Sequence, residues 1–226
     1  VSAPGLVISD KEAVCVSPAS RKADSVTVEV SSNGVEFSST AKPFQYFRTP
    51  ILTSAVPSSG GENGGTSVRI KGFDFANTPD LACRFGSTSV NASWISSTEI
   101  SCITPQSAPG QVILYISTNG QDSTDHGLPF VFLPRLQVAY MLPSSGVVYG
   151  GTAITIYGSG FVFSSLLTCR FNHSIDVNAT YIDSGSIRCI SPQTLRPASI
   201  SVAITFNGQD FTAVPGFYNF VEAPEV

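Results

Sequence analysis

The sequence predicts an all-β chain of tandem β-sandwiches arranged as an elongated array, and three observations carry this prediction. A segment of about 87 residues repeats along the chain, short runs alternate apolar and polar residues, and an Asn-Gly dipeptide follows the same run in each repeat. No segment shows an apolar stripe at helical spacing. Units of this length, with a turn signal about every 8–12 residues, are typical of an immunoglobulin-like sandwich.

Two full units align with each other, and we predict them at residues 50–135 and 136–226. The offset between matched residues is 86 in the front part of the unit and becomes 87 after one inserted residue. The matched positions, first unit before second, are Pro57 and Pro143, Gly64 and Gly150, Thr66 and Thr152, Phe75 and Phe161, Cys83 and Cys169, and Cys102 and Cys189.

Residues 1–49 match only the second half of a unit. They contain the equivalent of the second cysteine, Cys15, and the dipeptide Asn33-Gly34, but no Gly-Gly-Thr segment and no first cysteine. We therefore expect a C-terminal half-domain that belongs to a longer array and is completed by upstream residues, or alternatively by strands from a neighbouring copy. Residues 221–224 resemble the linkers around Pro50 and Pro134, so a further unit is also expected to follow.

The strands of each unit are predicted from alternation with a period of two. Early strands are expected around residues 68–70 and 154–156, and aromatic return strands around residues 44–46, 130–132 and 218–220. Between them lie alternating runs at residues 26–30, 112–116 and 200–204, each followed by Asn-Gly. This dipeptide favours a tight hairpin turn with positive φ at both central residues.

These motifs together resemble the IPT/TIG domain. The combination is Pro-x-x-Gly, Gly-Gly-Thr, apolar-x-apolar-x-Gly, a Phe, Cys-x-Phe-Gly, apolar-x-Cys-x-x-Pro and Asn-Gly, and it covers both full units and the half-domain. The resemblance implies an immunoglobulin-like fold that plexins, growth-factor-type receptors, fibrocystin-like surface proteins and some transcription factors use. The second unit departs at Asn172, where the first has Gly86, so its turn is expected to differ.

The five cysteines lie at repeat-equivalent positions, so pairing within each unit is the simplest assignment. We expect disulfides between Cys83 and Cys102 and between Cys169 and Cys189, with the partner of Cys15 upstream of the chain. Reduced buried thiols are the alternative, while a zinc site is disfavoured because no Cys-x-x-Cys or Cys/His spacing is present. Disulfides indicate the secretory pathway.

Three N-glycosylation sequons begin at Asn91, Asn172 and Asn178. All three lie between the paired cysteines of their unit. Together with the disulfides they favour a eukaryotic extracellular or cell-surface protein that carries N-linked glycans.

Residues with catalytic or metal-binding chemistry are sparse, and we predict no catalytic residue, no cofactor and no metal. His126 and His173 are the two histidines, and Gly158-Ser159-Gly160 is interpreted as a turn because no phosphate-loop lysine follows it. The acidic residues after Asn-Gly are interpreted as solubilising hairpin tips, with a calcium rim as the alternative. These acidic residues are Glu36, Asp122 and Asp210. Trp94 and Tyr181 are interpreted as core or semi-core aromatics, with an exposed binding platform as the alternative. Arg84 and Arg170 are interpreted as solvent-facing strand residues, with an anion site as the alternative.

Composition narrows the function classes. The chain of 226 residues has a net charge of −4 and an isoelectric point of 5.1, which disfavours nucleic-acid binding and hence a transcription-factor module. No apolar run reaches the roughly 20 residues of a membrane span, so no membrane contact is expected of this segment. We predict a structural or adhesive rod, with other units of the same long protein and extracellular proteins as partners. A spacer in a receptor ectodomain is the alternative.

Overall fold

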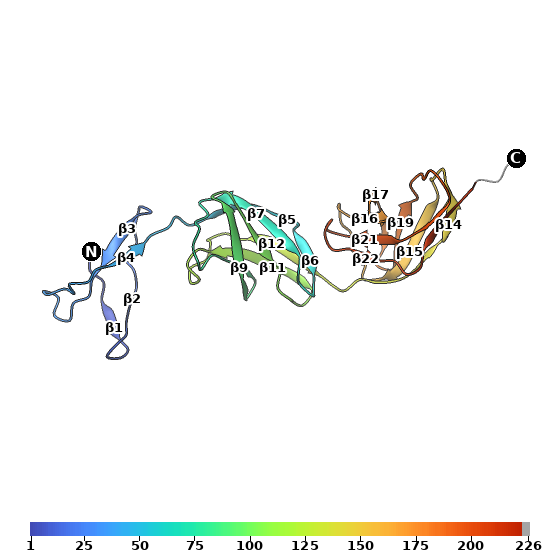
Figure 1. The fold of residues 1–226 in the computed structure, drawn as a ribbon. Helices are drawn as coiled ribbons and strands as arrows, with labels where there is room; N and C mark the ends of the chain where they lie inside the picture. The colour runs from blue at the N-terminus through green and yellow to red at the C-terminus, as the bar shows by residue number, and fades with distance from the viewer. Residues whose placement is uncertain (223–226) are drawn as a thin grey trace. The chain divides into compact units, whose positions relative to one another are not determined.

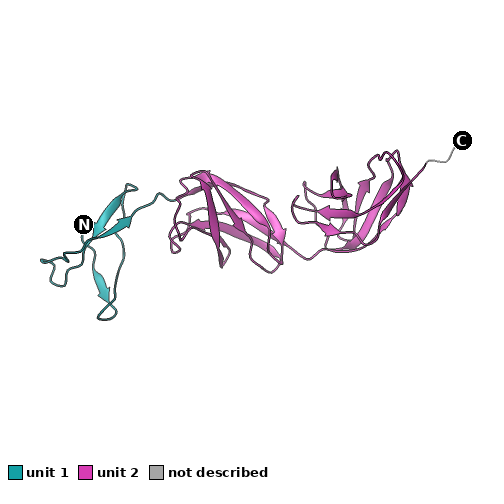
Figure 2. Ribbon diagram, in the orientation of Figure 1, with its two compact units in different colours: residues 1–49 teal, residues 50–226 magenta. Residues whose placement is uncertain are grey.

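The computed structural model describes residues 1–222 and forms two compact units, residues 1–49 and 50–226 (Figure 2). The predicted linker residues Ala223 and Pro224 lie outside the described residues. Residues 1–222 contain strands and no helix, which confirms the all-β prediction (Figure 1). In the same residues nothing forms a helix long and apolar enough to cross a membrane.

The unit of residues 1–49 consists of two separate two-stranded antiparallel sheets. Its strands are β1 Gly5–Val7, β2 Ala13–Cys15, β3 Ser25–Val28 and β4 Lys42–Gln45. The strands end two residues short of the predicted Val30 and one short of Tyr46. Tyr46 instead donates its hydroxyl proton to the carbonyl of Pro18 at 2.8 Å.

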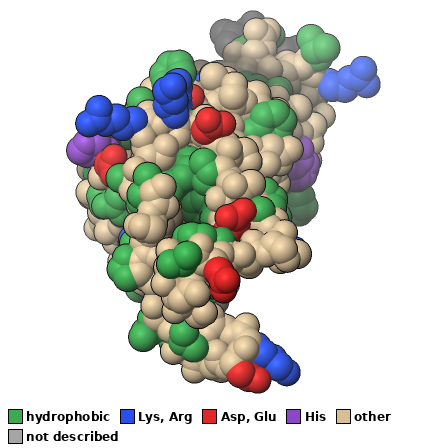
Figure 3. All heavy atoms as spheres, turned by 90° about the vertical axis from the view of Figure 1, so that its left-hand side faces the viewer, with side chains coloured by type: hydrophobic (Ala, Val, Ile, Leu, Met, Phe, Trp, Pro, Cys, Tyr) green, Lys and Arg blue, Asp and Glu red, His purple; other side chains and the backbone are tan. Residues whose placement is uncertain are grey.

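Apolar side chains of this unit are open to solvent. Val26 and Val28 are 39% and 38% exposed, and Phe44 is 40% exposed. Figure 3 shows one face of the molecule, on which hydrophobic side chains reach the surface between polar ones and charged side chains are scattered. A two-stranded sheet with an uncovered apolar face is marginal in water.

The first sandwich of the second unit wraps one continuous sheet around its core, in the order β5-β7-β10-β9-β8-β11-β12-β6. Strand β9 pairs with β10 along one part and with β8 along another, and so joins the two faces. The strands are β5 Ile51–Val56, β6 Ser59–Gly61, β7 Ser67–Phe73, β8 Ala82–Phe85, β9 Thr88–Ser96, β10 Glu99–Ile103, β11 Gly110–Ser117 and β12 Leu128–Leu133.

The second sandwich repeats this plan with two strands broken and one short strand, β22, added, and its strands form three sheets. The equivalent of β9 is interrupted at Ala179, and the equivalent of β11 is interrupted at Ser201. Its strands are β13 Gln137–Leu142, β14 Ser145–Val147, β15 Ala153–Ser159, β16 Thr168–Phe171, β17 Ile175–Asn178, β18 Thr180–Asp183, β19 Ser186–Ile190, β20 Ala198–Ile200, β21 Val202–Thr205, β22 Thr212–Ala213 and β23 Tyr218–Val221.

The inserted residue lies in the turn after the first cysteine strand. In the first sandwich Phe85 pairs with Thr88, so two residues form the turn, whereas Phe171 pairs with Ile175 and leaves three. Gly86 alone has positive φ in the shorter turn, while Asn172 and His173 both have it in the longer one. The turn therefore differs as predicted, through an added residue as well as through Asn in place of Gly.

Each sandwich has its own buried core, built on matched residues. The ring of Phe130 meets the rings of Phe85 and Phe132 edge to face, at centroid distances of 5.1 and 5.2 Å respectively. In the second sandwich Tyr218 takes the place of Phe130 and lies 5.0 Å from Phe220. Aromatic alternation on the return strands thus supplies the centre of each core.

The Gly-Gly-Thr segment and the Cys-x-x-Pro segment of each unit lie against each other. The amide of Gly65 donates to the carbonyl of Thr104, and the amide of Thr66 donates to the Oγ1 of Thr104 at 3.0 Å. Gly151 and Thr152 make the same bonds to Ser191. Two distant parts of the sequence motif are therefore one contact in the fold.

The Asn-Gly turns differ from the expected hairpin. Only the glycines have positive φ, at +74° in Gly34, +76° in Gly120 and +76° in Gly208. The asparagine side chain closes the turn instead, because its Oδ1 accepts the amides two and three residues ahead. The prediction of positive φ at both central residues was wrong, since a side-chain-closed turn needs only the glycine in that conformation.

Candidate functional site

The predicted acidic hairpin tips form the most distinctive polar arrangement of the chain. In both full units the asparagine also donates its Nδ2 to the aspartate, at 2.9 Å in Asn119–Asp122 and 2.7 Å in Asn207–Asp210. The Asp carboxylate is thereby fixed on a rigid loop. Among residues 1–222 no group of three His, Cys, Asp or Glu side chains lies close enough to hold a metal ion.

One of these tips contacts the neighbouring sandwich within the second compact unit. The Asp210 Oδ2 accepts a hydrogen bond from Thr66 Oγ1 at 2.6 Å, and Asn207 Nδ2 donates to the carbonyl of Ser59 at 3.1 Å. We call these four residues the joint. Thr66 and Asn207 are buried, at 1% and 6% exposed, so the joint excludes water from its centre.

Glu62 holds the linker beside the joint. Its amide donates to the carbonyl of Leu133 at 2.9 Å, and its Oε1 accepts the amide of Arg135 at 3.3 Å. Sequence reasoning singled out Asp210 but missed Ser59, Thr66 and Asn207 as a contact set. The available signal was the recurrence of Gly-Gly-Thr and Asn-Gly-x-Asp in both units, which does not say that one meets the other.

The structure pairs Cys83 with Cys102 and Cys169 with Cys189. Each bridge lies in the core, with its cysteines at most 2% exposed, and joins the strand of one face to the strand of the other. Cys15 lies exposed in β2 and has no disulfide within the described residues. Intra-unit bridges of this kind are a feature of extracellular proteins.

All three sequon asparagines are exposed. Asn91 pairs with Ala82 and Asn178 pairs with Thr168, so these two occupy the same place in the two sandwiches. Asn172 lies in the longer turn between β16 and β17. The sites are thus open to modification from solvent.

The two arginines beside the first cysteines both make contacts within the fold. Arg84 lies over the ring of Tyr115 at 5.4 Å, and Arg170 lies over Phe211 at 3.8 Å. Arg170 also pairs with Asp176 through two bonds of 2.6 and 2.7 Å. That hydrogen bonding, with charge attraction added to it, lowers the pKa of Asp176 and raises the pKa of Arg170.

The two equivalent aromatic residues differ: Tyr181 packs against the core of its sandwich and Trp94 is exposed, so the predicted core or semi-core position holds for Tyr181 only. Trp94 is 40% exposed and donates Nε1–H to the carbonyl of Phe75 at 3.1 Å. Tyr181 is half-buried against the second core and meets Phe163 edge to face.

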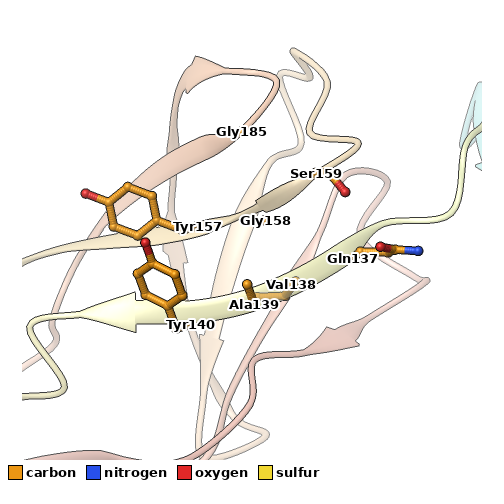
Figure 4. Close-up of a pocket in the computed structure, with 8 residues that line it drawn as sticks. All are labelled: Gln137, Val138, Ala139, Tyr140, Tyr157, Gly158, Ser159 and Gly185. Atoms are coloured by element: carbon orange, nitrogen blue, oxygen red, sulfur yellow. The ribbon is translucent and has the colours of Figure 1, made fainter.

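A hollow on the second sandwich carries a stacked tyrosine pair (Figure 4). The ring centroids of Tyr140 and Tyr157 are 4.9 Å apart, and the angle between the ring planes is 28°. Gln137 and Ser159 lie farther along the same two strands. Residues Ser54 and Lys71 stand at the matched positions of the first sandwich, so the pair belongs to the second unit alone. Sequence reasoning did not identify it.

One histidine contacts a hydroxyl. His173 Nε2 lies 3.2 Å from Ser201 Oγ, on an exposed turn beside the break between β20 and β21. This contact alone does not make a catalytic site, because nucleophilic catalysis also needs a third group to orient the base and a site for the reacting carbonyl. The predicted turn at Gly158-Ser159-Gly160 was wrong, because Gly158 and Ser159 pair with β13 inside β15 and only Gly160, with a φ of +84°, lies beyond the strand.

Two immunoglobulin-like sandwiches in tandem, each with its own internal disulfide, define a class of repeated extracellular module. A family model described as the IPT/TIG domain matches residues 50–132 and 137–220. The chain belongs to the IPT/TIG family, which confirms the resemblance found in the sequence.

Known relatives are much longer than this chain. It is 32% identical over 192 residues to human Fibrocystin-L (Homo sapiens), which covers 82% of this chain and 4% of that protein. It is 26% identical over 150 residues to mouse Plexin-A2 (Mus musculus), covering 65% of this chain and 8% of that protein. The full extracellular region of plexin A4, domains 1 to 10, matches 77% of this chain and 16% of that one, at 18% identity and a TM-score of 0.50, and so shares the fold.

Proposed function

We propose that this chain is a non-enzymatic spacer: tandem IPT/TIG units that form a rod-like segment of a stalk, coat or surface filament in a longer extracellular protein. The joint is the observation that carries this proposal. Thr66 and Asp210 bond one sandwich directly to the next, and Glu62 bonds to the linker. Direct bonds between successive modules keep their spacing, which is what a rod requires.

A spacer within a receptor ectodomain, with recognition elsewhere in the protein, is the second candidate. The matches to plexins favour it. In both candidates the partners are further domains of the same protein and other extracellular proteins. An acidic chain with an isoelectric point of 5.1 does not favour the transcription-factor use of the fold.

Replacement of residues 50–222 in the full-length surface protein separates a spacer from an adhesive surface. The replacement is an unrelated pair of immunoglobulin-like domains of the same length, displayed on cells. If these units are a spacer, the protein with the same-length replacement should function as before. A version of the replacement that is one domain shorter should then function less well. Loss of cell–cell or ligand binding on a same-length replacement would instead assign recognition to these units.

We further propose N-linked glycans on at least two of Asn91, Asn172 and Asn178. Their exposure and the extracellular class support this. Peptide mass spectrometry of natively sourced protein, before and after glycan removal, is the test. Three unmodified asparagines would count against the proposal.

The domains are proposed at residues 50–135 and 136–226, with residues 1–49 as half of a preceding domain. The exposed Val26, Val28 and Phe44 support the half-domain, because a covering strand would bury them. Cys15 is proposed to pair with a cysteine upstream. Mass mapping of disulfides in the longer protein tests that pairing.

A further inference from the structure

We propose that the second sandwich has its own docking surface, formed by Gly146 and Thr152 with the buried Tyr218 hydroxyl beneath them, for the Asn-Gly-x-Asp hairpin of an IPT/TIG unit joined after it. This inference rests on the proposed spacer function and names the partner of one surface. The first sandwich shows the occupied form of the same surface, and the second shows its open form.

The occupied form is the joint. Thr66 follows the two glycines of its Gly-Gly-Thr segment, and its Oγ1 bonds to the Asp210 carboxylate of the following unit. Pro57 and Gly60 beside it are buried, and Ser59 is half-buried. The occupant is therefore known in chemical detail: a carboxylate already held by an asparagine amide.

The open form lacks this cover. At the matched positions Pro143 and Ser145 are exposed, and Gly146 and Thr152 are half-buried. The backbone is the same in both, because Ser191 bonds to Thr152 as Thr104 bonds to Thr66. Exposure of a surface that is buried in its repeat is the expected state of an unfilled docking site.

Tyr218 adds an independent sign of a missing acceptor. Its side chain is 0% exposed, and its hydroxyl has no hydrogen-bond partner within the described residues. The hydroxyl lies directly beneath the surface in question, since a Cβ on Gly146 would collide with both this hydroxyl and Thr152 Oγ1, and a docking carboxylate reaches it once the Gly146 segment moves aside. Buried hydroxyls are almost always hydrogen-bonded, so an unfilled one calls for an acceptor.

The chemistry of the surface selects a carboxylate. Two hydroxyl donors, from Thr152 and Tyr218, converge at Gly146, and a carboxylate oxygen accepts two such bonds in its charged state. In the first sandwich Phe130 stands in place of Tyr218 and offers no donor. The joint that follows the second sandwich therefore has one bond more than the joint that precedes it.

The test uses the whole chain with residues 134–221 repeated directly after Val221, so that the added unit follows the second as the second follows the first. ¹⁵N relaxation measures how each unit tumbles, and the Tyr218 hydroxyl proton is followed by NMR. We expect the added unit to tumble with the second, and exchange of the hydroxyl proton to slow about tenfold against the unextended chain.

Matched variants assign the effect. Asp210→Ala in the added copy, or Tyr218→Phe together with Thr152→Val, is expected to release the added unit to faster, independent tumbling. Tyr218→Phe reproduces the residue of the first sandwich and so preserves the core. Asp122→Ala removes a hairpin carboxylate that is not at this joint, and is expected to change nothing.

Independent tumbling of the added unit, or coupled tumbling that survives both sets of changes, would overturn the inference. Such a failure leaves the spacer proposal standing, because that proposal is tested by same-length replacement on cells. A second arm needs no extension. Phe130→Tyr in the natural chain places a hydroxyl beside Asp210, and its proton is expected to exchange slowly only while Asp210 is present.

Discussion

Gly64 and Gly150 lie where a side chain has no room. A Cβ on Gly64 would stand 2.6 Å from the backbone of Pro105, and one on Gly150 would stand 2.7 Å from the backbone of Pro192. Both glycines also have positive φ, at +72° and +74°. The first glycine of Gly-Gly-Thr is thus required by close backbone approach, and its recurrence follows from packing inside each unit.

Gly64→Ala is expected to lower the free energy of unfolding of the first sandwich by about 2–4 kcal/mol, because strain and backbone overlap add. Urea unfolding followed by Trp94 fluorescence measures it, since the first sandwich holds the tryptophan. Gly61→Ala is the control, because no atom lies within 4 Å of its Cβ position. Equal effects of the two changes would contradict the packing argument.

The Arg170–Asp176 pair links β16 to β17 and gives stability a pH dependence. The folded-state pKa of Asp176 lies below the ordinary value of 3.8, because Arg170 bonds to its charged form. The contribution is therefore present above pH 3.8 and is lost as the pH falls through the lower, folded pKa. We expect Asp176→Asn to lower the Tm at neutral pH and to have no effect in strong acid. A Tm difference that persists in strong acid would argue against the pair.

At the scale of the element, the hairpin closed by an asparagine side chain occurs in every repeat of the chain. The same Oδ1 bonds close it at Asn33, Asn119 and Asn207, whatever the loop is next to. The hairpin is therefore preformed, and docking adds bonds to a loop that is already ordered. Preformed loops lose little conformational entropy on binding.

Asn207→Ala and Asn119→Ala remove the same turn from two different places. Both are expected to loosen their own loop, but only Asn207→Ala should uncouple the two sandwiches, because only Asn207 also donates to Ser59. ¹⁵N relaxation of residues 50–222 separates the two effects. Equal uncoupling by both variants would show that the joint bonds do not hold the sandwiches together.

Sequence pattern predicted strand positions well where side chains alternate, as at Val68 and Ile70, both fully buried in β7. It failed at the Asn-Gly turns, because a side-chain hydrogen bond and a backbone turn compete and the dipeptide alone does not decide between them. The joint was beyond prediction for a different reason. A contact between two repeats depends on the linker path, which no single-unit motif encodes.

At the scale of the whole molecule, the two compact units differ in how much they can stabilise themselves. Residues 50–222 contain two buried cores and two disulfides, while all but two of residues 1–49 are exposed. We expect a chain of residues 50–226 to unfold cooperatively and residues 1–49 alone to give no cooperative thermal transition. Circular dichroism on both pieces is the measurement, and a cooperative transition in 1–49 with Cys15 as a free thiol would refute it.

Reduction of the disulfides belongs to the same scale. Loop-closure entropy assigns about 3 kcal/mol to each bridge. Reduced protein is therefore expected to unfold at lower urea concentration in both sandwiches. An unchanged midpoint would mean that the cores alone set the stability.

The position of the disulfides also limits how far the chain lengthens under tension. Each bridge ties residues 19 or 20 positions apart in sequence, Cys83 to Cys102 and Cys169 to Cys189. An extended residue contributes about 3.3–3.6 Å, so a unit that is pulled open keeps roughly 65 Å of its contour length locked. A series of such units is therefore expected to lengthen under tension in steps of similar size, one for each unit that unfolds. Each step becomes longer by the length held inside the disulfide loop when the bridges are reduced.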